Sequence, residues 1–293
     1  MISVIIVSWN VRDELRLCLE SIYRAQKNTG QEYEIIVVDN ASGDKSAQMV
    51  ASLFPMVKLL RNDTNVGFAA ACNQGATLAK GDYLLFLNPD TMLGDEGVSS
   101  LVKFLELQPN AGIVAPRLVY DDGVTQPSIR RFPSPFIMLL LLTKLSRMAG
   151  YSTQWNRYMY RHFDYNSLRS VEQVMGAAML MPRSIFEAVG GFDSGFFIWF
   201  EEVDLCKRVR DAGYLVFFNP AVSVTHARAR SFTQQSILWR QKQFSRSARW
   251  YASKHYGSFG YLTIWIASWL AVLVTAVLAP LADYLKQYQA TER

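Results

Sequence analysis

The triplet Asn88-Pro89-Asp90 places a carboxylate directly after an apolar run at residues 83–87. A carboxylate held rigidly there could bind Mg²⁺ or Mn²⁺ together with phosphate oxygens of a substrate. These hard ions use oxygen ligands and often take only one or two carboxylates from the protein. An Asn-Pro turn is the alternative interpretation, because such turns are common. On its own, the triplet therefore indicates either a metal site or a turn.

A second group of acidic residues lies at 199–204, in the sequence WFEEVD. Glu201, Glu202 and Asp204 stand beside two aromatic residues, and Glu201 and Asp204 are three apart, so they share one face of a helix. Carboxylates crowded next to apolar side chains have raised pKa values, which suits a general base near neutral pH. The alternative is an acidic helix start that the helix dipole favours.

Two single residues could complete such a site. Asp39 follows an apolar run at 34–38 and could accept hydrogen bonds from a base or a ribose. A single Asp at the end of a strand is, however, often a turn former or a helix cap. His226 comes shortly after the run 222–224, and it gains a functional meaning only if the fold brings it to a metal.

The elements that would position these residues alternate between strands and helices. Continuous apolar runs at 3–8, 34–38, 57–60 and 83–87 predict strands buried on both faces. Helical patterns around residues 15–22, 49–53 and 68–78 separate the runs, so we expect an α/β fold with a parallel sheet and right-handed crossovers. Ligands bind such sheets at the carboxyl ends of the strands, which directs attention to residues 9–10, 39–40, 61–65 and 88–90.

The pattern changes after residue 118. A proline-rich loop precedes an apolar helix at 136–148 with a basic end. Further along, we expect a strand of small residues at 176–183, a helix at 201–212 and a strand at 214–218. The first strand is not followed by a Gly-x-Gly-x-x-Gly motif, and there is no Walker A motif, which argues against a dinucleotide-binding Rossmann fold and a P-loop.

Composition excludes several classes of protein. Among 293 residues, 50% are hydrophobic and 19% are charged, a balance that excludes disorder, collagen-like repeats and coiled coils. The three cysteines, at 18, 72 and 206, have neither metal-site spacing nor a disulfide framework, and a reducing compartment is the simpler interpretation. The N-terminus does not resemble a secretory signal, because no basic residue precedes its apolar run.

Two long stretches lack acidic residues. Residues 212–282 and 123–163 contain Lys and Arg but no Asp or Glu, which suits phosphate, nucleic acid or an anionic membrane surface. Nucleic acid is the weaker interpretation, since the basic stretches flank apolar, membrane-like segments and no recognition module is present. We therefore expect membrane lipid, and no nucleic acid, as a partner.

The C-terminal end predicts a membrane helix. The 28 residues 255–282 contain no Asp, Glu, Lys or Arg, and about 20 apolar residues suffice to cross a bilayer. We expect a transmembrane helix at 259–282 and a tail at 283–293, with the preceding part of the chain in the cytoplasm because Lys and Arg crowd the N-terminal side of the helix. A helix in the membrane interface and a buried core helix are the alternatives. Residues 232–258 would form a basic interfacial segment, and residues 136–142 would either dip into the interface or belong to the core.

An ordered set of motifs resembles a known family. The segments SVIIVSWN at 3–10, VVDNAS at 37–42, NVGFAAACNQG at 65–75, NPD at 88–90, GAAML at 176–180, VGGFD at 189–193 and FEEVDL at 200–205 are together similar to inverting family 2 glycosyltransferases of the GT-A fold. Within that family the chain looks most like the rhamnosyltransferase-like branch of bacterial surface-polysaccharide biosynthesis. The resemblance implies a mixed, mainly parallel sheet flanked by helices, with a nucleotide-sugar-binding half at 1–125 and an acceptor-binding half at 126–231.

The resemblance also implies roles for individual residues. Asp39 would bind the nucleobase, Asp90 and His226 would hold Mg²⁺ or Mn²⁺, Glu202 would be the base, and Asp204 is the rival base. Asn88 stands where the family's metal-binding triplet has its first Asp, and Ala229 stands where the family often has Gly. Arg228 or Arg230 would help to neutralise the diphosphate. The remaining contacts to the nucleotide sugar are expected from Ser8, Asn10, Asn65, Gly67, Asn73 and Asn88.

The expected activity is metal-dependent inverting transfer of a sugar to a polyprenyl-diphosphate-linked saccharide at the cytoplasmic face of a bacterial inner membrane. L-Rhamnose from dTDP-rhamnose is the first expectation. The alternatives are galactofuranose, glucose, N-acetylglucosamine or mannose from a UDP- or GDP-sugar, and a non-catalytic, membrane-anchored protein that binds sugar nucleotides. The sequence leaves the oligomeric state open, including a homo-oligomer.

Overall fold

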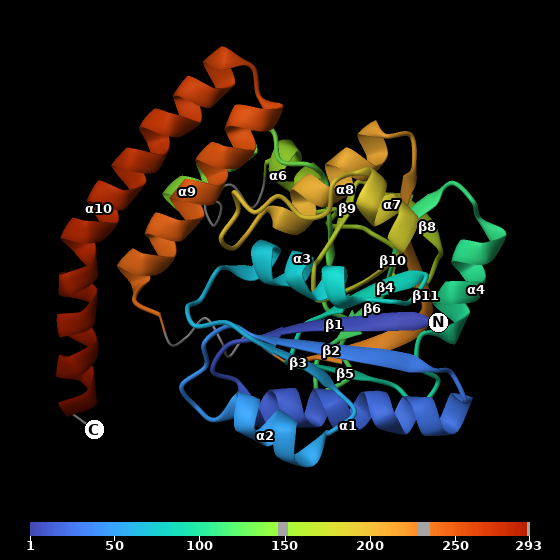
Figure 1. Ribbon diagram of the computed structural model, residues 1–293. Helices are drawn as coiled ribbons and strands as arrows, with labels where there is room; N and C mark the ends of the chain where they lie inside the picture. Colours follow the sequence, from blue (N-terminus) through green and yellow to red (C-terminus); the bar gives the residue numbers. More distant parts are fainter. Residues whose placement is uncertain (146–151, 228–234, 292–293) are drawn as a thin grey trace.

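A mixed sheet of nine strands forms the centre of the protein (Figure 1). The computed structural model describes residues 1–145, 152–227 and 235–291, with the backbone alone for 279–291. Eight strands follow the order β3-β2-β1-β4-β10-β6-β11-β5, and β8 pairs with β11. The nine strands are β1 (Ile2–Ser8), β2 (Tyr33–Asp39), β3 (Lys58–Arg61), β4 (Tyr83–Leu87), β5 (Thr91–Leu93), β6 (Ala111–Val119), β8 (Arg169–Val171), β10 (Ala178–Pro182) and β11 (Leu215–His226).

The first half of the chain forms the parallel part of the sheet. Strand β1 pairs in parallel with β2 and β4, and β2 pairs in parallel with β3. All seven residues of β1 are buried, as expected for a strand that is covered on both faces. The prediction of an α/β fold with a mainly parallel sheet in this half is therefore confirmed.

The second half makes the sheet mixed. Strand β10 runs antiparallel to both β4 and β6. Strand β6 was not predicted, because Gly112 and Pro116 interrupt its apolar pattern. Strand β11 is continuous over Leu215–His226, where the sequence predicts a strand at 214–218 and a separate apolar run at 222–224. The pairing of β11 with β6 shifts between Asn219 and Ser223, and such an irregularity bends a strand without ending it. A separate ribbon pairs β7 (Ile129–Arg130) with β9 (Gln173–Val174).

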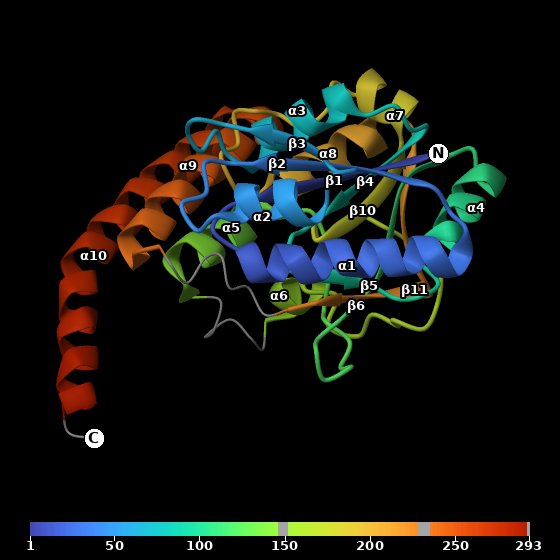
Figure 2. The ribbon, with the colours of Figure 1, turned by 60° about the horizontal axis from the view of Figure 1, so that its bottom comes forward.

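Helices cover both faces of the sheet (Figures 1 and 2). One face carries α1 (Arg12–Thr29), α2 (Ser46–Leu53) and α4 (Ser99–Leu107). The opposite face carries α3 (Phe68–Leu78), α7 (Arg183–Ala188) and α8 (Glu201–Asp211). Helix α8 matches the helix expected at 201–212, and its buried residues join the core with those of α3.

In the described part of the chain, four further helices lie beside the sheet domain. Helix α5 (Pro135–Thr143) ends earlier than the helix predicted at 136–148, because Lys144 has φ 59°; residues 146–148 lie outside the described residues. A short helix, α6 (Thr153–Tyr158), follows. Helices α9 (Ile237–His255) and α10 (Ser258–Thr291) form a hairpin along one side of the molecule (Figures 1 and 2), and α10 continues through the residues expected to form a separate tail.

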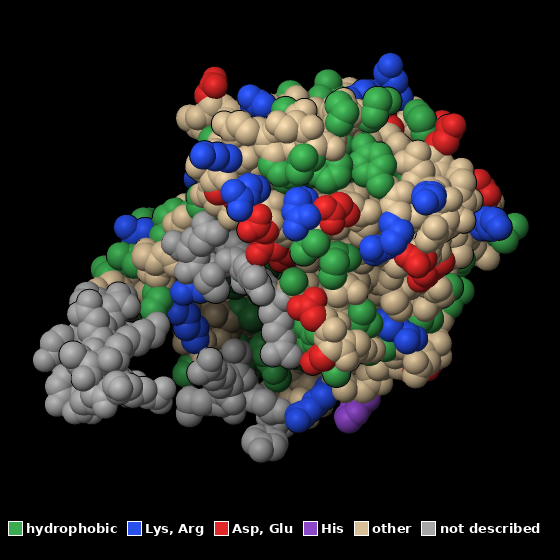
Figure 3. Space-filling model, turned by 90° about the horizontal axis from the view of Figure 1, so that it is seen from below, with side chains coloured by type: hydrophobic (Ala, Val, Ile, Leu, Met, Phe, Trp, Pro, Cys, Tyr) green, Lys and Arg blue, Asp and Glu red, His purple; other side chains and the backbone are tan. Residues whose placement is uncertain are grey.

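Helices α5, α9 and α10 together form a helical arm. Seen from below, the surface is hollowed where this arm meets the sheet domain (Figure 3). Hydrophobic side chains are visible inside the hollow, and Lys or Arg side chains lie beside it. Helix α10 contacts both α9 and α5. The arm is thus an assembly of three helices rather than a single helix that leaves the domain.

Candidate active site

A pocket of about 590 Å³ opens at the carboxyl ends of the central strands. Its size is in the range of about 300–1,000 Å³ that is usual for small-molecule sites. The pocket is where the strand order predicts a ligand site, because Trp9 and Asn40 follow β1 and β2, and Asn88 and Asp90 follow β4. Glu202 from α8 and His226 from the end of β11 complete the pocket, so Asp90, Glu202 and His226 share one cavity.

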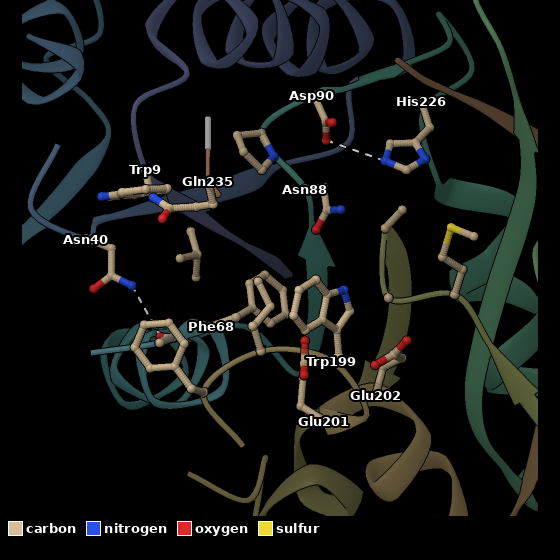
Figure 4. Close-up of a pocket in the computed structure, with 18 of the residues that line it drawn as sticks. Trp9, Asn40, Phe68, Asn88, Asp90, Trp199, Glu201, Glu202, His226 and Gln235 are labelled. Atoms are coloured by element: carbon tan, nitrogen blue, oxygen red, sulfur yellow. Dashed lines mark hydrogen bonds and ion pairs between the residues drawn. The ribbon is translucent and has the colours of Figure 1, made fainter. Parts of the chain in front are cut away.

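Antiparallel pairing of β5 with β11 brings Asp90 and His226 together. His226 pairs with Thr91 in the sheet, and the Ala227 amide donates a hydrogen bond to the Asp90 carbonyl at 3.0 Å. The two side chains face each other, with 3.5 Å between Asp90 Oδ1 and His226 Nε2 (Figure 4). On its far side, His226 Nδ1 lies 2.8 Å from Gln126 Oε1.

These contacts fit a divalent cation. An amide oxygen can only accept a hydrogen bond, so Gln126 favours the tautomer that carries the proton on Nδ1 of His226. The lone pair of Nε2 then faces the Asp90 carboxylate, and two acceptors at that distance favour a cation between them. A hydrogen-bonded second ring nitrogen is usual for a metal-binding histidine. Asp90 and His226 would supply two ligands, and Mg²⁺ or Mn²⁺ commonly completes its coordination with substrate phosphates and water. Among the described residues, no cluster of three or more His, Cys, Asp or Glu could hold a metal.

The two glutamates lie across the pocket from Asp90 and His226, with Asn88 and Trp199 drawn between the two pairs (Figure 4). They begin helix α8, directly after Trp199 and Phe200, whose φ angles of 67° and 72° are unusual for such large side chains. This backbone turn aims the start of the helix at the pocket.

Burial controls the charge of the two glutamates. It raises the pKa of Glu202, and it raises the pKa of Glu201 well above its usual range, with the Glu202 carboxylate adding to the shift of its neighbour. Glu201 Oε2 is buried without a hydrogen-bond partner among the described residues. A raised pKa is what a carboxylate needs to take a proton near neutral pH. Residues 201–204 therefore form an acidic helix start, and the same helix start presents a candidate base. The two interpretations that the sequence left open are compatible.

A network of side-chain amides shapes the wall near β2. Asn40 donates hydrogen bonds to Asn65 Oδ1 at 2.9 Å and to the Gly67 carbonyl at 3.3 Å. Gly67 has φ 90°, and a Cβ atom there would come within 2.7 Å of the Phe197 carbonyl, so only glycine fits. The predicted residues Asn65 and Gly67 line the pocket, as does Asn88.

Other residues expected to contact the nucleotide sugar are not among those that line the pocket. Asn73 is engaged with the backbone of Phe192, and Asn10 Oδ1 accepts from the Gly43 amide. Asp39 and Ser8 are buried beside each other at the ends of β2 and β1. Asp39 Oδ1 and Ser8 Oγ each lack a hydrogen-bond partner among the described residues. Arg228 and Arg230 lie outside the described residues.

Asp204, the rival base, is placed away from the pocket. Its buried carboxylate accepts from Arg208 Nε at 2.7 Å, contacts Lys254 Nζ at 2.7 Å and lies 2.8 Å from His255 Nε2. Burial alone would raise the pKa of Asp204, but hydrogen bonds from His255 and Lys254 and the charge of Arg208 lower it to about 2. This carboxylate joins α8 to α9, so its position argues against the role of base and for a structural one.

Replacing Asp204 with Asn is expected to lower the free energy of unfolding by about 3 kcal/mol, because it removes a fully buried carboxylate charge from its pairs with Arg208, Lys254 and His255. A lowered folded-state pKa stabilises the protein above the usual value near 3.8, and this contribution is lost as the pH falls towards 2. Denaturant unfolding at several pH values measures both effects. Asp211→Asn is the matched control on the same helix, because its pair with Lys207 is exposed and worth less than about 1 kcal/mol. Equal losses from both variants would contradict this role for Asp204.

Several pocket residues escaped sequence reasoning. Tyr120, Gln126, Gln235 and Trp239 line the pocket, but they stand in stretches without a recognisable motif. Gln126 is one hundred residues away from its partner His226, and no spacing in the sequence links the two. Only the aromatic character of some of these residues could have marked them, and aromatic side chains are more often part of a core.

Comparison with known proteins agrees with this geometry. Residues 3–190 match the family described as Glycosyl transferase family 2. An N-acetylglucosaminyl-diphospho-decaprenol L-rhamnosyltransferase of Mycobacterium tuberculosis is 29% identical over 249 residues, which cover 79% of this chain and 77% of that protein. Rhamnosyltransferase WbbL of Escherichia coli K12 is 28% identical over 264 residues, which cover 84% of this chain and 92% of WbbL.

Solved structures share the GT-A-like fold. The mannosyltransferase PcManGT of Pyrobaculum calidifontis, in complex with GDP-Man and Mn²⁺, has a TM-score of 0.57 at 16% identity over 99% of this chain and 79% of that one. GalNAc-T7 with UDP, GalNAc and Mn²⁺ also has a TM-score of 0.57, at 19% identity over 79% of this chain and 44% of GalNAc-T7. The family match covers well over half of the sequence. The chain therefore belongs to glycosyltransferase family 2.

Proposed function

We propose that this glycosyltransferase moves L-rhamnose from dTDP-rhamnose to a polyprenyl-diphosphate-linked saccharide, in a metal-dependent reaction that inverts the anomeric centre. The observation that carries the proposal is the single pocket that brings Asp90 and His226 opposite Glu202. The choice of sugar and acceptor is supported by the printed names of two relatives, both of which are rhamnosyltransferases and one of which acts on a decaprenol-linked compound.

The donor would bind across the ends of β1, β2 and β4. The buried oxygens of Asp39 and Ser8 that lack partners would receive hydrogen bonds from a nucleobase or ribose after a small opening of the wall at Asn40. The diphosphate would lie near Asp90 and His226, which would hold the metal ion. A bound Mg²⁺ or Mn²⁺ would neutralise the charge of the departing diphosphate. Residues 1–125 would then form the donor half and residues 126–231 the acceptor half.

The rest of the reaction needs only a base and alignment. Glu202, on the opposite wall, would take the proton from the acceptor hydroxyl as that oxygen attacks the sugar carbon. Direct displacement with such a base inverts the centre and needs no protein nucleophile. Trp199 and Asn88 lie between the two sides of the pocket (Figure 4) and would hold the sugar in line with the attacking oxygen.

Other donors use the same chemistry. Galactofuranose, glucose, N-acetylglucosamine or mannose carried by UDP or GDP would need a change in the sugar subsite and none in the metal or the base. A non-catalytic sugar-nucleotide-binding protein is disfavoured, because the chain belongs to a glycosyltransferase family and Asp90, His226 and Glu202 line one pocket. The enzyme would work at the cytoplasmic face of a bacterial inner membrane, where one C-terminal helix is long and apolar enough to associate with lipid.

The test is a transfer assay with purified full-length enzyme. A panel of nucleotide sugars is supplied with an N-acetylglucosaminyl-diphospho-polyprenol acceptor and Mg²⁺, and the product is identified by mass spectrometry. The proposal expects a rhamnosylated lipid from dTDP-rhamnose, and no product after chelation of the metal. Transfer from another donor at a higher rate would overturn the choice of sugar, and hydrolysis without transfer would overturn the choice of acceptor.

A further inference from the structure

We propose that helix α10 lies along the surface of an anionic membrane, docked together with α9, and does not cross the bilayer. Residues Ser258–Leu278 are long and apolar enough to cross, and the sequence by itself predicts a transmembrane helix. The packing of the two helices leads to a different arrangement. The proposal does not depend on which sugar the enzyme transfers.

The hairpin places polar residues of α9 beside the middle of the apolar segment. Ser245 Oγ donates a hydrogen bond to the Ser268 carbonyl at 3.3 Å, and Arg249 Nη1 donates to Ser268 Oγ at 2.9 Å. Ser268 is the central residue of the segment Ser258–Leu278. If α10 crossed the bilayer, Arg249 and the neighbouring Arg246 would therefore lie at the level of the hydrocarbon centre, where charged side chains are costly.

Helix α9 cannot separate from α10 by moving away, because it is fastened to the catalytic domain. Trp250 Nε1 donates to Asp193 Oδ2 at 3.0 Å, and Ser247 Oγ donates to the Ile198 carbonyl at 2.7 Å. Lys254 pairs with both Asp193 and Asp204. If α10 stood perpendicular to the membrane plane, α9 would carry Asp193, Asp204 and the loop at Ile198 into the lipid. The alternative is that α10 breaks its own contacts with α9.

The outer face of α10 is suited to lie in a membrane interface. Apolar side chains are exposed over most of the helix surface, from Trp265 at 43% to Phe259 at 85%, and Ile266, Leu270, Val274 and Leu278 are exposed as well. The inward face, with Ile264 and Ser268, is buried. Tryptophan is enriched at the boundary between headgroups and acyl chains, and Trp265 and Trp269 are both exposed on this helix.

The charge next to this apolar surface selects an anionic bilayer as the partner. Lys242 and Arg246 are exposed on α9, and the Arg249 guanidinium lies 4.8 Å from the centre of the Trp269 ring, so the basic and apolar surfaces adjoin. Residues 212–282 contain no acidic residue. Basic side chains near the surface of an anionic leaflet are attracted to it, whereas a second copy of this arm would place like charges together.

Docking in this orientation also places the pocket close to the membrane. Trp239, in the first turn of α9, lines the catalytic pocket, and the same helix carries the basic residues that would face the lipid. An acceptor embedded in the membrane would then reach the pocket along the surface, without having to leave the plane of the bilayer.

The first experiment measures topology in a bacterial host. The native cysteines are all buried, so an introduced cysteine is the accessible one. Ala290→Cys, near the end of α10, is treated with a membrane-impermeant maleimide in intact spheroplasts and after lysis, and Ser52→Cys on the exposed surface of α2 is the matched cytoplasmic control. The proposal expects both to react only after lysis. Reaction of Ala290→Cys in intact spheroplasts would place the end of α10 outside and overturn the proposal.

The second experiment measures the contact with lipid. Purified full-length protein is floated with vesicles of phosphatidylcholine alone or of phosphatidylcholine with about 30% phosphatidylglycerol. The second composition provides the anionic surface to which basic segments are attracted. We expect binding to need the anionic lipid, and Trp265→Gln with Trp269→Gln to reduce it at least about tenfold. Leu53→Gln with Leu107→Gln, two exposed apolar residues elsewhere on the surface, should leave it unchanged. Unchanged vesicle binding by the tryptophan variant would overturn the proposal. So would a dimer of the unmodified protein without lipid that becomes a monomer in the tryptophan variant, because a second copy would then cover this face.

Discussion

Glu202→Gln is expected to reduce transfer by about 10²–10⁴-fold, the usual contribution of a positioned general base. The substitution keeps the size of the side chain, and Gln cannot accept the proton of the acceptor hydroxyl. Because Glu202 is only half-buried in the first turn of α8 and Gln has nearly the same shape, the substitution should leave the protein folded. Steady-state transfer rates and circular dichroism of the same sample measure the two properties.

The pH dependence gives this prediction a second readout. Burial raises the pKa of Glu202, and a base works only when deprotonated, so kcat/KM should rise with pH through a value above the usual range of a glutamate. This acid limb of the pH profile of kcat/KM should be absent in Glu202→Gln. Asp204→Asn serves as the control, because it changes a carboxylate two residues along the same helix that lies outside the pocket. Full activity in Glu202→Gln, or loss of the acid limb in Asp204→Asn alone, would assign the base to another residue.

Asp90→Ala is expected to reduce transfer by about 10³-fold or more, because the metal that it would hold supplies several kcal/mol of charge stabilisation to the departing diphosphate. The effect should appear together with the loss of metal-dependent binding of a nucleoside diphosphate, measured by calorimetry with and without Mg²⁺. Within the described part of the chain, the Asp90 carboxylate makes no ion pair besides its approach to His226 at 3.5 Å, so folding should be retained.

Asp95→Ala provides a matched control for the metal. Asp95 lies only five residues away and is an exposed carboxylate paired with Arg24, and its removal should change neither transfer nor nucleotide binding. His226→Gln is the complementary variant, since it removes the imidazole that faces Asp90. If nucleotide binding to Asp90→Ala still depended on Mg²⁺ with unchanged affinity, the metal would have to be held elsewhere.

The sequence predicts the parallel half of the fold because each of its strands is a continuous apolar run. Strands β1 and β4 differ from their predicted bounds by at most one residue. Strand β6 could not be predicted in the same way, because Gly112 and Pro116 interrupt it and its place in the sheet depends on long-range pairing with β10 and β11. The place of β6, antiparallel to β10 and parallel to β11, is set by tertiary contacts that a local pattern does not contain.

The candidate site was predictable where chemistry and local structure coincide. Asp90 and Glu202 stand directly at the ends or starts of elements, and the structure places both in the pocket. The sequence could not separate Glu202 from Asp204, because both carboxylates lie in the first turn of α8. Burial and the contacts with α9 distinguish them. In the same way, the apolar composition of α10 predicts a membrane helix, but only its packing against Arg249 and Ser245 bears on its orientation.

The most direct test of the account is the anomeric configuration of the product. The enzyme is incubated with nucleotide sugar, lipid-linked acceptor and Mg²⁺, and the configuration of the transferred sugar is determined by NMR and compared with that of the donor. A pocket that aligns one base with one metal-bound diphosphate predicts inversion in a single displacement. Retention of configuration, or a sugar attached to the protein, would contradict the proposed roles of Glu202 and Asp90 together.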